Sequence, residues 1–379
     1  MLLRPEAVPV PTVTEADELA ELLARGDDLR NVVAQRIDLS APVFDLEAVE
    51  VAGAVFLGCD FASAEVEGSL VRRGALVIGG FEGLPYEPFR TGLYTPAELD
   101  EDVGGRTRDA AIYAHYEQAG RSSPNILEAL AQRLHDTSID DALGDAIGET
   151  VERRLDSKLV AIMGGHSVKR NDWAFFATAH TARLIASAGY QVVTGGGPGA
   201  MEAGNLGAYF ADHEETDLNW ALTTLAPAPD YKAEGWRRTA EQVVQRFPEG
   251  RRSYAVPTWF YGHEPSNLFS QAIAKYFSNS LREDGLLALA LHGIVFSPGS
   301  AGTLQEIFQD NAQNRYETFD YRSPMVFLGR YRWGLAGGVY DLVRAEGAAY
   351  ADMMTLVDDP QAVVDFLAKT PPREKQAAA

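Results

Sequence analysis

The sequence predicts an α/β protein, a doubly wound (Rossmann-like) parallel sheet that follows an N-terminal mixed α/β domain. From Lys158 onward, short apolar runs alternate with segments of helical periodicity. The apolar runs are nearly continuous, as in the strands of a parallel sheet that helices cover on both faces. Three of these runs end in small-residue turns, and the carboxyl ends of strands are where open α/β sheets bind ligands.

The first 150 residues follow a more mixed pattern. We expect a short helix at Ala16–Ala24 and buried strands within Val51–Phe61 and Gly74–Phe81, and we see no internal repeat. Residues from Thr107 to Asp156 have helical spacing. The predicted organisation is an accessory α/β domain at 1–105, a helical connector at 106–154, a Rossmann-like domain at 155–370 and a disordered tail at 371–379.

The long run from Asn267 to Leu291 is predicted to be helical. Its apolar residues, among them Ile273, Tyr276 and Leu286, fall on more than one face. That is more apolar surface than one contact with a sheet requires, so we expect a homo-oligomer, a dimer or higher.

Composition narrows the classes of partner. The 379 residues carry a formal net charge of −21, which argues against binding to nucleic acid or to anionic membranes. The single cysteine, Cys59, has no intramolecular disulfide partner, the N-terminal residues do not resemble a secretory signal, and no apolar run reaches ~18 residues. We therefore expect a cytoplasmic protein that holds any phosphate ligand with local donors.

Three glycine-rich turns follow predicted strands, at Gly164–Ser167, at Thr194–Glu202 and at Pro298–Gly302. Glycine lets backbone N–H groups approach an anion, and the helix that follows adds a partial positive charge. Any one of these turns could be an ordinary tight connection between a strand and a helix. Three in one domain favour a nucleotide site.

Two local patterns allow other interpretations. Gly195, Gly197 and Ala200 formally fit the dinucleotide fingerprint, but they follow the second strand of the domain and no acidic residue lies at the expected offset. Thr303 and Glu306 fit a capping box, which is the favoured interpretation of these two residues alone. A carboxylate beside a phosphate-sized turn could also hold ribose hydroxyls or a water. The seven histidines show no metal-ligand spacing.

The motifs together resemble a known family. GGGPGAMEA (195–203) and PGSAGTLQE (298–306) look like the two signatures of the LOG ("Lonely Guy") phosphoribohydrolases. The chain is more similar to the bacterial pyrimidine/purine nucleotide 5′-monophosphate nucleosidases, which share the GGHS turn and a His-Gly pair, here His292-Gly293. The resemblance covers about residues 158 to 370.

This resemblance implies a hydrolase that cleaves the N-glycosidic bond of nucleoside 5′-monophosphates to free base and ribose 5-phosphate, without a metal or organic cofactor. It assigns the catalytic pair to Glu306 and Arg282. Arg282 lies 16 positions before Pro298, one more than in relatives, and Ser300 replaces a glycine of the family signature. These departures keep open an alternative, a non-catalytic nucleotide-binding sensor or carrier of the same fold.

The residues that the motifs assign to substrate and phosphate binding come from the three turns. They are Gly165, His166, Ser167, Gly195, Gly196, Gly197, Gly199, Ala200, Met201, Glu202, Pro298, Gly299, Ser300, Ala301, Gly302 and Thr303. The sequence does not identify the acid that protonates the leaving base. Asp284 and His166 are the two candidates. The preferred base and the role of residues 1–150 stay open.

Overall fold

The computed structural model describes residues 11–148 and 155–375. The chain divides into two compact units, which are described separately. The larger contains Gly92–Asn125 and the described residues from Ile139 onward, and the smaller contains the described residues up to Thr91 together with Ile126–Ser138. The domain boundaries expected from the sequence stay predictions.

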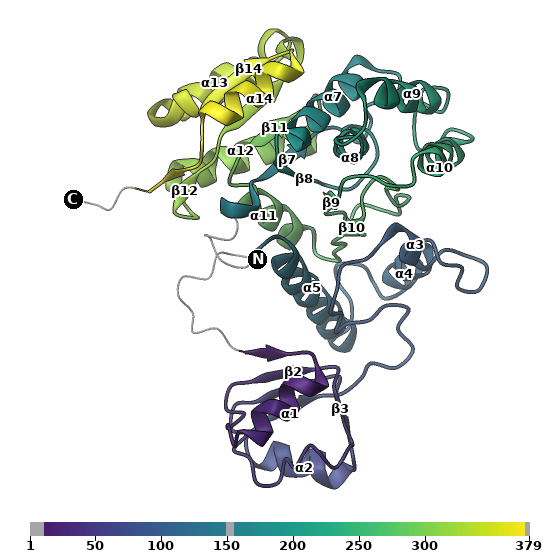
Figure 1. The fold of residues 1–379 in the computed structure, drawn as a ribbon, viewed down its shortest axis with the longest axis vertical. Helices are drawn as coiled ribbons and strands as arrows, with labels where there is room; N and C mark the ends of the chain where they lie inside the picture. The colour runs from purple at the N-terminus through teal and green to yellow at the C-terminus, as the bar shows by residue number, and fades with distance from the viewer. Residues whose placement is uncertain (1–10, 149–154, 376–379) are drawn as a thin grey trace. The chain divides into compact units, whose positions relative to one another are not determined.

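Short parallel strands and two helices form most of the smaller unit (Figure 1). Its main sheet has the order β1 (Thr12–Val13), β2 (Val33–Gln35), β4 (Val55–Leu57) and β6 (Leu76–Ile78), and β3 (Asp38–Leu39) pairs with β5 (Asp60–Phe61). The helices are α1 (Ala16–Ala24), as predicted, and α2 (Ala64–Arg72). The buried apolar side chains of this unit include Leu19, Leu29, Val51, Phe56 and Leu70.

Successive strands of this unit recur at a nearly constant interval. The aligned residues are Val33, Val55 and Leu76, which lie 22 and then 21 positions apart. A residue with positive φ stands two positions before each of them: Asn31 (59°), Gly53 (78°) and Gly74 (93°). A Cβ on Gly53 would lie 2.6 Å from Oδ1 of Asn31, so glycine lets successive turns stack closely. The unit is a short parallel repeat, contrary to the prediction of no internal repeat.

The two predicted strands of this unit are shorter than expected. The strand within Val51–Phe61 is interrupted at Gly58, whose φ is +59°, and forms β4 and β5. The strand within Gly74–Phe81 is reduced to β6, and its Leu76 is 54% exposed. It is therefore an edge strand rather than the buried strand predicted.

A seven-stranded sheet forms the centre of the larger unit. β7 (Leu159–Met163) lies between β8 (Gln191–Thr194) and β11 (Ile294–Phe296). The sheet continues from β8 to β9 (Tyr254–Ala255) and β10 (Ala272–Ile273), and from β11 to β13 (Met325–Leu328) and β14 (Met354–Val357). All neighbouring strands are parallel. The chain winds outward in both directions from β7, which confirms the doubly wound, Rossmann-like α/β fold.

Helices join and cover these strands (Figure 1). They are α7 (Trp173–Ser187), α8 (Ala200–Tyr209), α9 (Glu215–Leu225), α10 (Trp236–Arg246), α11 (Asn279–Leu289), α12 (Ala301–Tyr316), α13 (Val339–Glu346) and α14 (Pro360–Lys369), with a π-helical turn η1 (Tyr331–Leu335) and a 3₁₀ segment η2 (Ala348–Met353). Ile185 of α7 and Val363 of α14 pack with Val160 and Val295 of the sheet. The described chain between β6 and β7 includes the helices α3 (Pro96–Leu99), α4 (Arg108–Gln118) and α5 (Ile126–Ile147). The predicted helical segment Thr107–Asp156 thus contains α4 and α5, and its residues 149–154 lie outside the described part.

The predicted helix from Asn267 to Leu291 is wrong in its first half. That half contains β10, and the helix α11 begins only at Asn279. Its apolar side chains are buried inside the larger unit, with Ile273, Tyr276 and Leu286 each at most 2% exposed. The apolar surface on which the expectation of a homo-oligomer rested is therefore already covered within the chain. That expectation now rests on the family resemblance alone.

The predicted disordered tail contains a short strand. β15 (Arg373–Glu374) pairs antiparallel with β12 (Tyr321–Arg322), and Lys375 N donates to the carbonyl oxygen of Asp320. Residues 376–379 of the predicted tail lie outside the described part. Among the described residues, no helix has the length and apolar character needed to cross a membrane.

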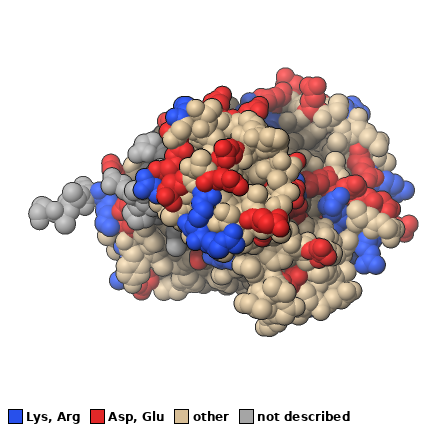
Figure 2. Space-filling model, turned by 90° about the horizontal axis from the view of Figure 1, so that it is seen from below, with Lys and Arg blue, Asp and Glu red and all other residues tan. Residues whose placement is uncertain are grey.

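Acidic side chains are spread over much of the face that Figure 2 displays, and basic side chains form smaller groups. This distribution agrees with the net charge of −21. A phosphate ligand would gain little from the overall field and depends on the donors of its own site.

Candidate functional site

The three glycine-rich turns interlock at the point where the sheet changes direction. The first follows β7 and the third follows β11, which are neighbouring strands. Gly165 N donates to the carbonyl oxygen of Pro298 (3.1 Å), and Ala200 N donates to the carbonyl oxygen of Gly165 (3.1 Å). The structure therefore brings the three predicted turns together at the topological switch point, where doubly wound sheets bind ligands.

Glycine is required where the turns touch. Gly199 has a φ of +73°, and a Cβ on it would lie 2.5 Å from the carbonyl oxygen of Gly165. A Cβ on Gly299 would collide with the side chain of Thr303 and lie 2.9 Å from Gly165 N. Thr303, 3% exposed, therefore fills the space that the missing side chain leaves.

The second turn is enclosed. Every residue from Gly195 to Ala200 is buried. A Cβ on Gly195 or Gly197 would meet the side chain of Met201 at 2.7 and 2.8 Å, and one on Gly196 would meet Pro257 at 2.7 Å. This turn forms a wall of the site and does not present an open anion site.

The third turn is open to solvent and begins α12. Ser300 is the N-cap residue, makes no side-chain capping bond and is exposed together with Ala301 and Gly302. The first N–H groups of a helix have no intrahelical acceptor, so this end of α12 offers unshared donors and a partial positive charge. Of the three turns, this one can hold a phosphate directly.

The capping-box interpretation of Thr303 and Glu306 is wrong. Because Ser300 is the N-cap, Thr303 is the third helical residue and Glu306 lies one turn further along α12. Glu306 is too far along the helix to bond the N–H group of the N-cap. Serine at position 300 is compatible with the backbone, whose φ of −118° does not require glycine.

Arg282 reaches the second turn from α11. Its Nη1 would lie 3.3 Å from a Cβ on Gly195. Its Nε donates to Oδ1 of Asn279 (3.0 Å) and its Nη2 to Oε1 of Glu283 (3.1 Å), and the arginine is only 7% exposed. Two partners thus fix the guanidinium at the wall of the site. Arg282 reaches this wall although it lies one residue farther from Pro298 in the sequence than the arginine of the relatives.

Glu306 is a partly buried carboxyl in the field of this ion pair. Burial raises the pKa of Glu306 to about 7, which nearby Arg282 opposes and Glu283 reinforces. Tyr261, 67% exposed, contacts the start of α11, where its hydroxyl accepts a hydrogen bond from Nδ2 of Asn279 (3.0 Å). Gln305 of α12 donates from Nε2 to Oε2 of Glu283 on α11 (2.7 Å), so the two helices lie side by side next to Arg282 and Glu306. The catalytic role of this pair stays a prediction.

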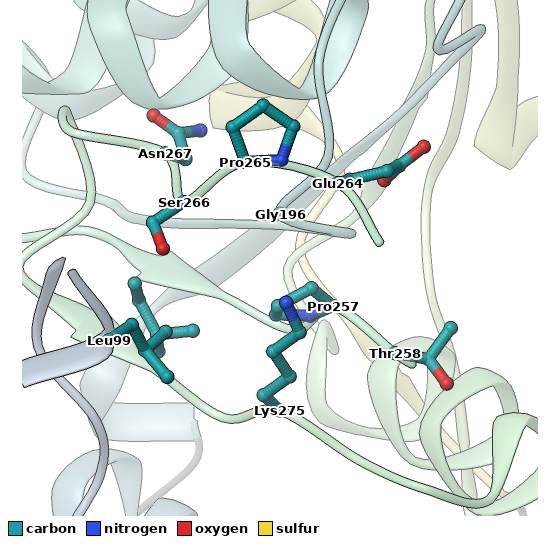
Figure 3. A pocket seen from close by; sticks show the side chains of 10 residues that line it. Leu99, Gly196, Pro257, Thr258, Glu264, Pro265, Ser266, Asn267 and Lys275 are labelled. Atoms are coloured by element: carbon teal, nitrogen blue, oxygen red, sulfur yellow. The ribbon is translucent and has the colours of Figure 1, made fainter. Parts of the chain in front are cut away.

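A small cavity beside the second turn is lined by Gly196, Glu264, Ser266 and Lys275, among others (Figure 3). Its volume is about 10 Å³, which accommodates roughly one water molecule and is far too small for a nucleotide. Figure 3 shows Lys275 extending toward the segment that carries Glu264.

A buried acid holds Lys275 in place. Lys275 Nζ donates to Asp109 of α4 (2.9 Å), and the same carboxylate accepts from Trp259 Nε1 (2.8 Å). Burial by itself raises the pKa of Asp109, but Lys275 and His263 outweigh it and lower the pKa to about 2. The segment predicted as a connector thus supplies an anchor to the wall of the site.

The remaining predicted residues have other surroundings. His166 and Ser167 are exposed. Glu202 is 2% exposed and binds Arg170, whose Nε lies 3.0 Å from Glu202 Oε2, so its carboxylate is already engaged within the chain. Asp284 is exposed and accepts a hydrogen bond from Gln309.

Several residues at the site carry no sequence motif. Arg332 of η1 donates from Nε to the carbonyl oxygen of Gly299 (2.8 Å) and so braces the third turn. Glu264 and Lys275 come from the chain between β9 and α11, where no local pattern marks them. Only Glu283, adjacent to Arg282, could have been found from the sequence as a charged neighbour.

Within residues 11–148 and 155–375, no group of histidine, cysteine, aspartate and glutamate side chains is arranged to hold a metal ion. No family model matches the chain, and neither does any curated protein.

Some solved structures show a distant likeness. The molybdenum cofactor binding protein from the phototrophic bacterium Rippkaea orientalis is 12% identical with a TM-score of 0.34, covering 56% of this chain and 96% of that one. Two structures of the Moco carrier protein from Chlamydomonas reinhardtii are 16% and 14% identical, with TM-scores of 0.35 and 0.36. They cover 56% of this chain and 99% and 98% of their own. Likenesses this distant do not show a shared ligand or activity.

Proposed function

We propose that this protein is a LOG-like nucleotide 5′-monophosphate nucleosidase, which hydrolyses the N-glycosidic bond of nucleoside 5′-monophosphates to free base and ribose 5-phosphate. The observation that carries the proposal is the contact between α11 and α12, which brings the segments of Arg282 and Glu306 together beside the open N-terminus of α12. These are the two residues that the family resemblance assigns to the chemistry.

The open end of α12 supports the first step, which is phosphate binding. The backbone N–H groups of Ala301, Gly302 and Thr303 would hold the 5′-phosphate. Arg332 keeps the preceding turn in place through Gly299. This site needs little net positive charge, which suits a protein of net charge −21.

Glu306 would act on the ribose. Cleavage of a glycosidic bond builds positive charge on the sugar ring, and a nearby carboxylate stabilises that charge and can accept a proton from the attacking water. A carboxyl whose pKa is about 7 is well matched to proton transfer near neutral pH. Arg282 would orient the sugar and hold Glu306 partly ionised.

The test is incubation of the protein with the common nucleoside 5′-monophosphates and chromatographic detection of free base and ribose 5-phosphate. We expect release of both products in equal amounts from at least one nucleotide, and loss of that release in Glu306→Gln. Tight binding without release across the whole panel would overturn the proposal.

A second candidate function is a carrier or sensor that holds a phosphorylated ligand without turnover. Two observations favour it: Arg282 is already paired with Glu283, and burial keeps a substantial fraction of Glu306 uncharged near neutral pH. The same assay separates the two functions, because a carrier binds nucleotide or another phosphorylated ligand and releases it unchanged.

A further inference from the structure

A second carboxyl, that of Glu264, lies at the wall that the second turn forms. Oε2 of Glu264 would be 2.6 Å from a Cβ on Gly197, so this carboxyl rests directly against the second glycine turn. Glu264 belongs to the segment that follows β9, and the carboxyl ends of the parallel strands face the ligand side of the sheet.

Arg282 connects the two carboxyls electrostatically. Nη1 of Arg282 would lie 3.3 Å from a Cβ on Gly195, and Oε2 of Glu264 would lie 2.6 Å from a Cβ on Gly197, so both side chains line the same turn. The positive charge of Arg282 opposes the rise that burial causes in the pKa of Glu306 and in that of Glu264. Among the described residues, the Glu264 carboxyl makes no hydrogen bond or ion pair, whereas the neighbouring Lys275 is held by Asp109. Glu264 is thus a carboxyl at the site whose hydrogen-bonding capacity is unused.

We propose that Glu264 is the acid that protonates the leaving base. The inference rests on the proposed nucleosidase function and supplies the group that the sequence left unassigned. Glycosidic hydrolysis commonly uses two carboxyls, of which one acts on the leaving group and the other on the water. Burial raises the pKa of Glu264, with His166, Lys275, Arg282 and His263 opposing, and this favours the protonated form that an acid catalyst needs.

The step balances with water as the only co-substrate. The bond between C1′ and the base nitrogen breaks, its electron pair stays on the nitrogen, and that nitrogen takes the proton of Glu264. The oxygen of water bonds to C1′ and loses a proton to Glu306. Solvent then restores a proton to Glu264 and removes one from Glu306.

The two guesses made from the sequence are less suited to this role. Asp284 is exposed and engaged by Gln309 of α12. His166 is exposed on the first turn. Glu264 is more enclosed than either and lies at the wall that a bound nucleotide would contact.

The test compares leaving groups that need a proton with leaving groups that do not. GMP and UMP release bases that must be protonated, whereas 7-methyl-GMP and nicotinamide mononucleotide carry a cationic base that leaves as a neutral molecule. For Glu264→Gln we expect kcat to fall about 100-fold or more with the uncharged base that the wild type cleaves. With the cationic counterpart we expect a change of less than about threefold, because no proton is required.

Two further variants and one binding measurement complete the test. Glu264→Asp keeps the acid one methylene farther back, and should give a smaller loss confined to the uncharged bases. Asp284→Asn is the matched control and should leave turnover of both substrates unchanged. The Kd of ribose 5-phosphate, measured by calorimetry, should be unaltered in Glu264→Gln, since this side chain is not assigned to phosphate.

Equal losses on both classes of substrate, or no loss on either, would overturn the assignment of Glu264 while leaving the nucleosidase function intact. A wild-type protein that releases base from none of the four nucleotides would overturn the nucleosidase function and this inference with it. The two failures are therefore distinguishable in one set of assays.

Discussion

Replacing Glu306 with glutamine should stabilise the protein at alkaline pH while it removes turnover. Burial raises the pKa of Glu306 from 4.5 to about 7. Below about pH 4.5 the carboxyl is protonated in both the folded and the unfolded chain, and its titration contributes nothing to the difference in stability. Between about pH 4.5 and 7 the unfolded chain ionises first, folding takes up a proton, and the free energy of unfolding falls. Above about pH 7 the carboxyl is ionised in both states, and the folded chain keeps the full free-energy cost of the buried charge.

The magnitude follows from the two pKa values. An interval of about 2.5 pH units corresponds to about 3.4 kcal/mol at 1.36 kcal/mol per unit. This is an upper limit, since the side chain is only partly buried and water screens its charge. Glutamine carries no charge in either state. Relative to the wild type, Glu306→Gln should therefore gain about 2–3 kcal/mol between pH 4.5 and pH 8, or roughly 4–10 °C in Tm.

The assay is thermal unfolding at pH 4.5 and pH 8, with kcat measured on the same preparation at pH 8. We expect kcat to fall by on the order of 100-fold or more, as for other charged groups aimed at a transition state. Asp284→Asn is the control, because this exposed acid lies on the neighbouring helix. A Tm difference between Glu306→Gln and wild type that is identical at both pH values would refute the buried-charge argument, and an unchanged kcat would remove Glu306 from the chemistry.

Three other substitutions test separate parts of the site. Ser300→Asp puts a negative charge at the open end of α12 and should weaken ribose 5-phosphate binding more than about 10-fold, measured by calorimetry, whereas Ser300→Gly should leave it nearly unchanged. Gly197→Ala places a Cβ 2.6 Å from Glu264 and should lower kcat with a Tm change of only a few degrees; unchanged turnover would contradict the close packing of that wall. Asp109→Asn leaves Lys275 buried without its counter-ion and should reduce the free energy of unfolding in urea by about 3–5 kcal/mol, and a loss below about 1 kcal/mol would show that Lys275 finds water instead.

The sheet of the larger unit was predictable because each strand has a clear signal in its own local sequence. Ile294–Phe296 is a short, wholly apolar run that ends in Pro298-Gly299, and a helix begins directly afterwards. The first half of the run from Asn267 to Leu291 was wrongly predicted as helix because it has no such local signal. This half is apolar because the loop and β10 are buried by tertiary packing, and burial without a regular period does not distinguish a helix from a loop.

The site was only partly predictable. Glu306 belongs to a motif and Arg282 follows from the family resemblance, and a hydrogen bond between α11 and α12 lies next to both. Glu264 and Lys275 are single charged residues in an irregular segment, and only the fold places them beside Gly196 and Gly197. The capping box predicted at Thr303 and Glu306 was wrong because the sequence alone did not show that α12 begins at Ala301, before Thr303.

The repeat of the smaller unit, one turn and one strand every 21 or 22 residues, has a consequence for how the length of the unit can change. Among the described residues, each strand of this unit pairs only with strands 21 or 22 residues away, so the unit is a linear array. The stability of such an array is nearly the sum of the stabilities of its repeats and of the interfaces between neighbouring repeats. Deleting or duplicating one whole repeat would leave each remaining strand paired with the equivalent strand of a neighbouring repeat. Insertions of any other length would shift Gly53 or Gly74 out of alignment with the turn before it. The array can therefore lose or gain length in whole modules, in a way that the interwoven sheet of the larger unit cannot.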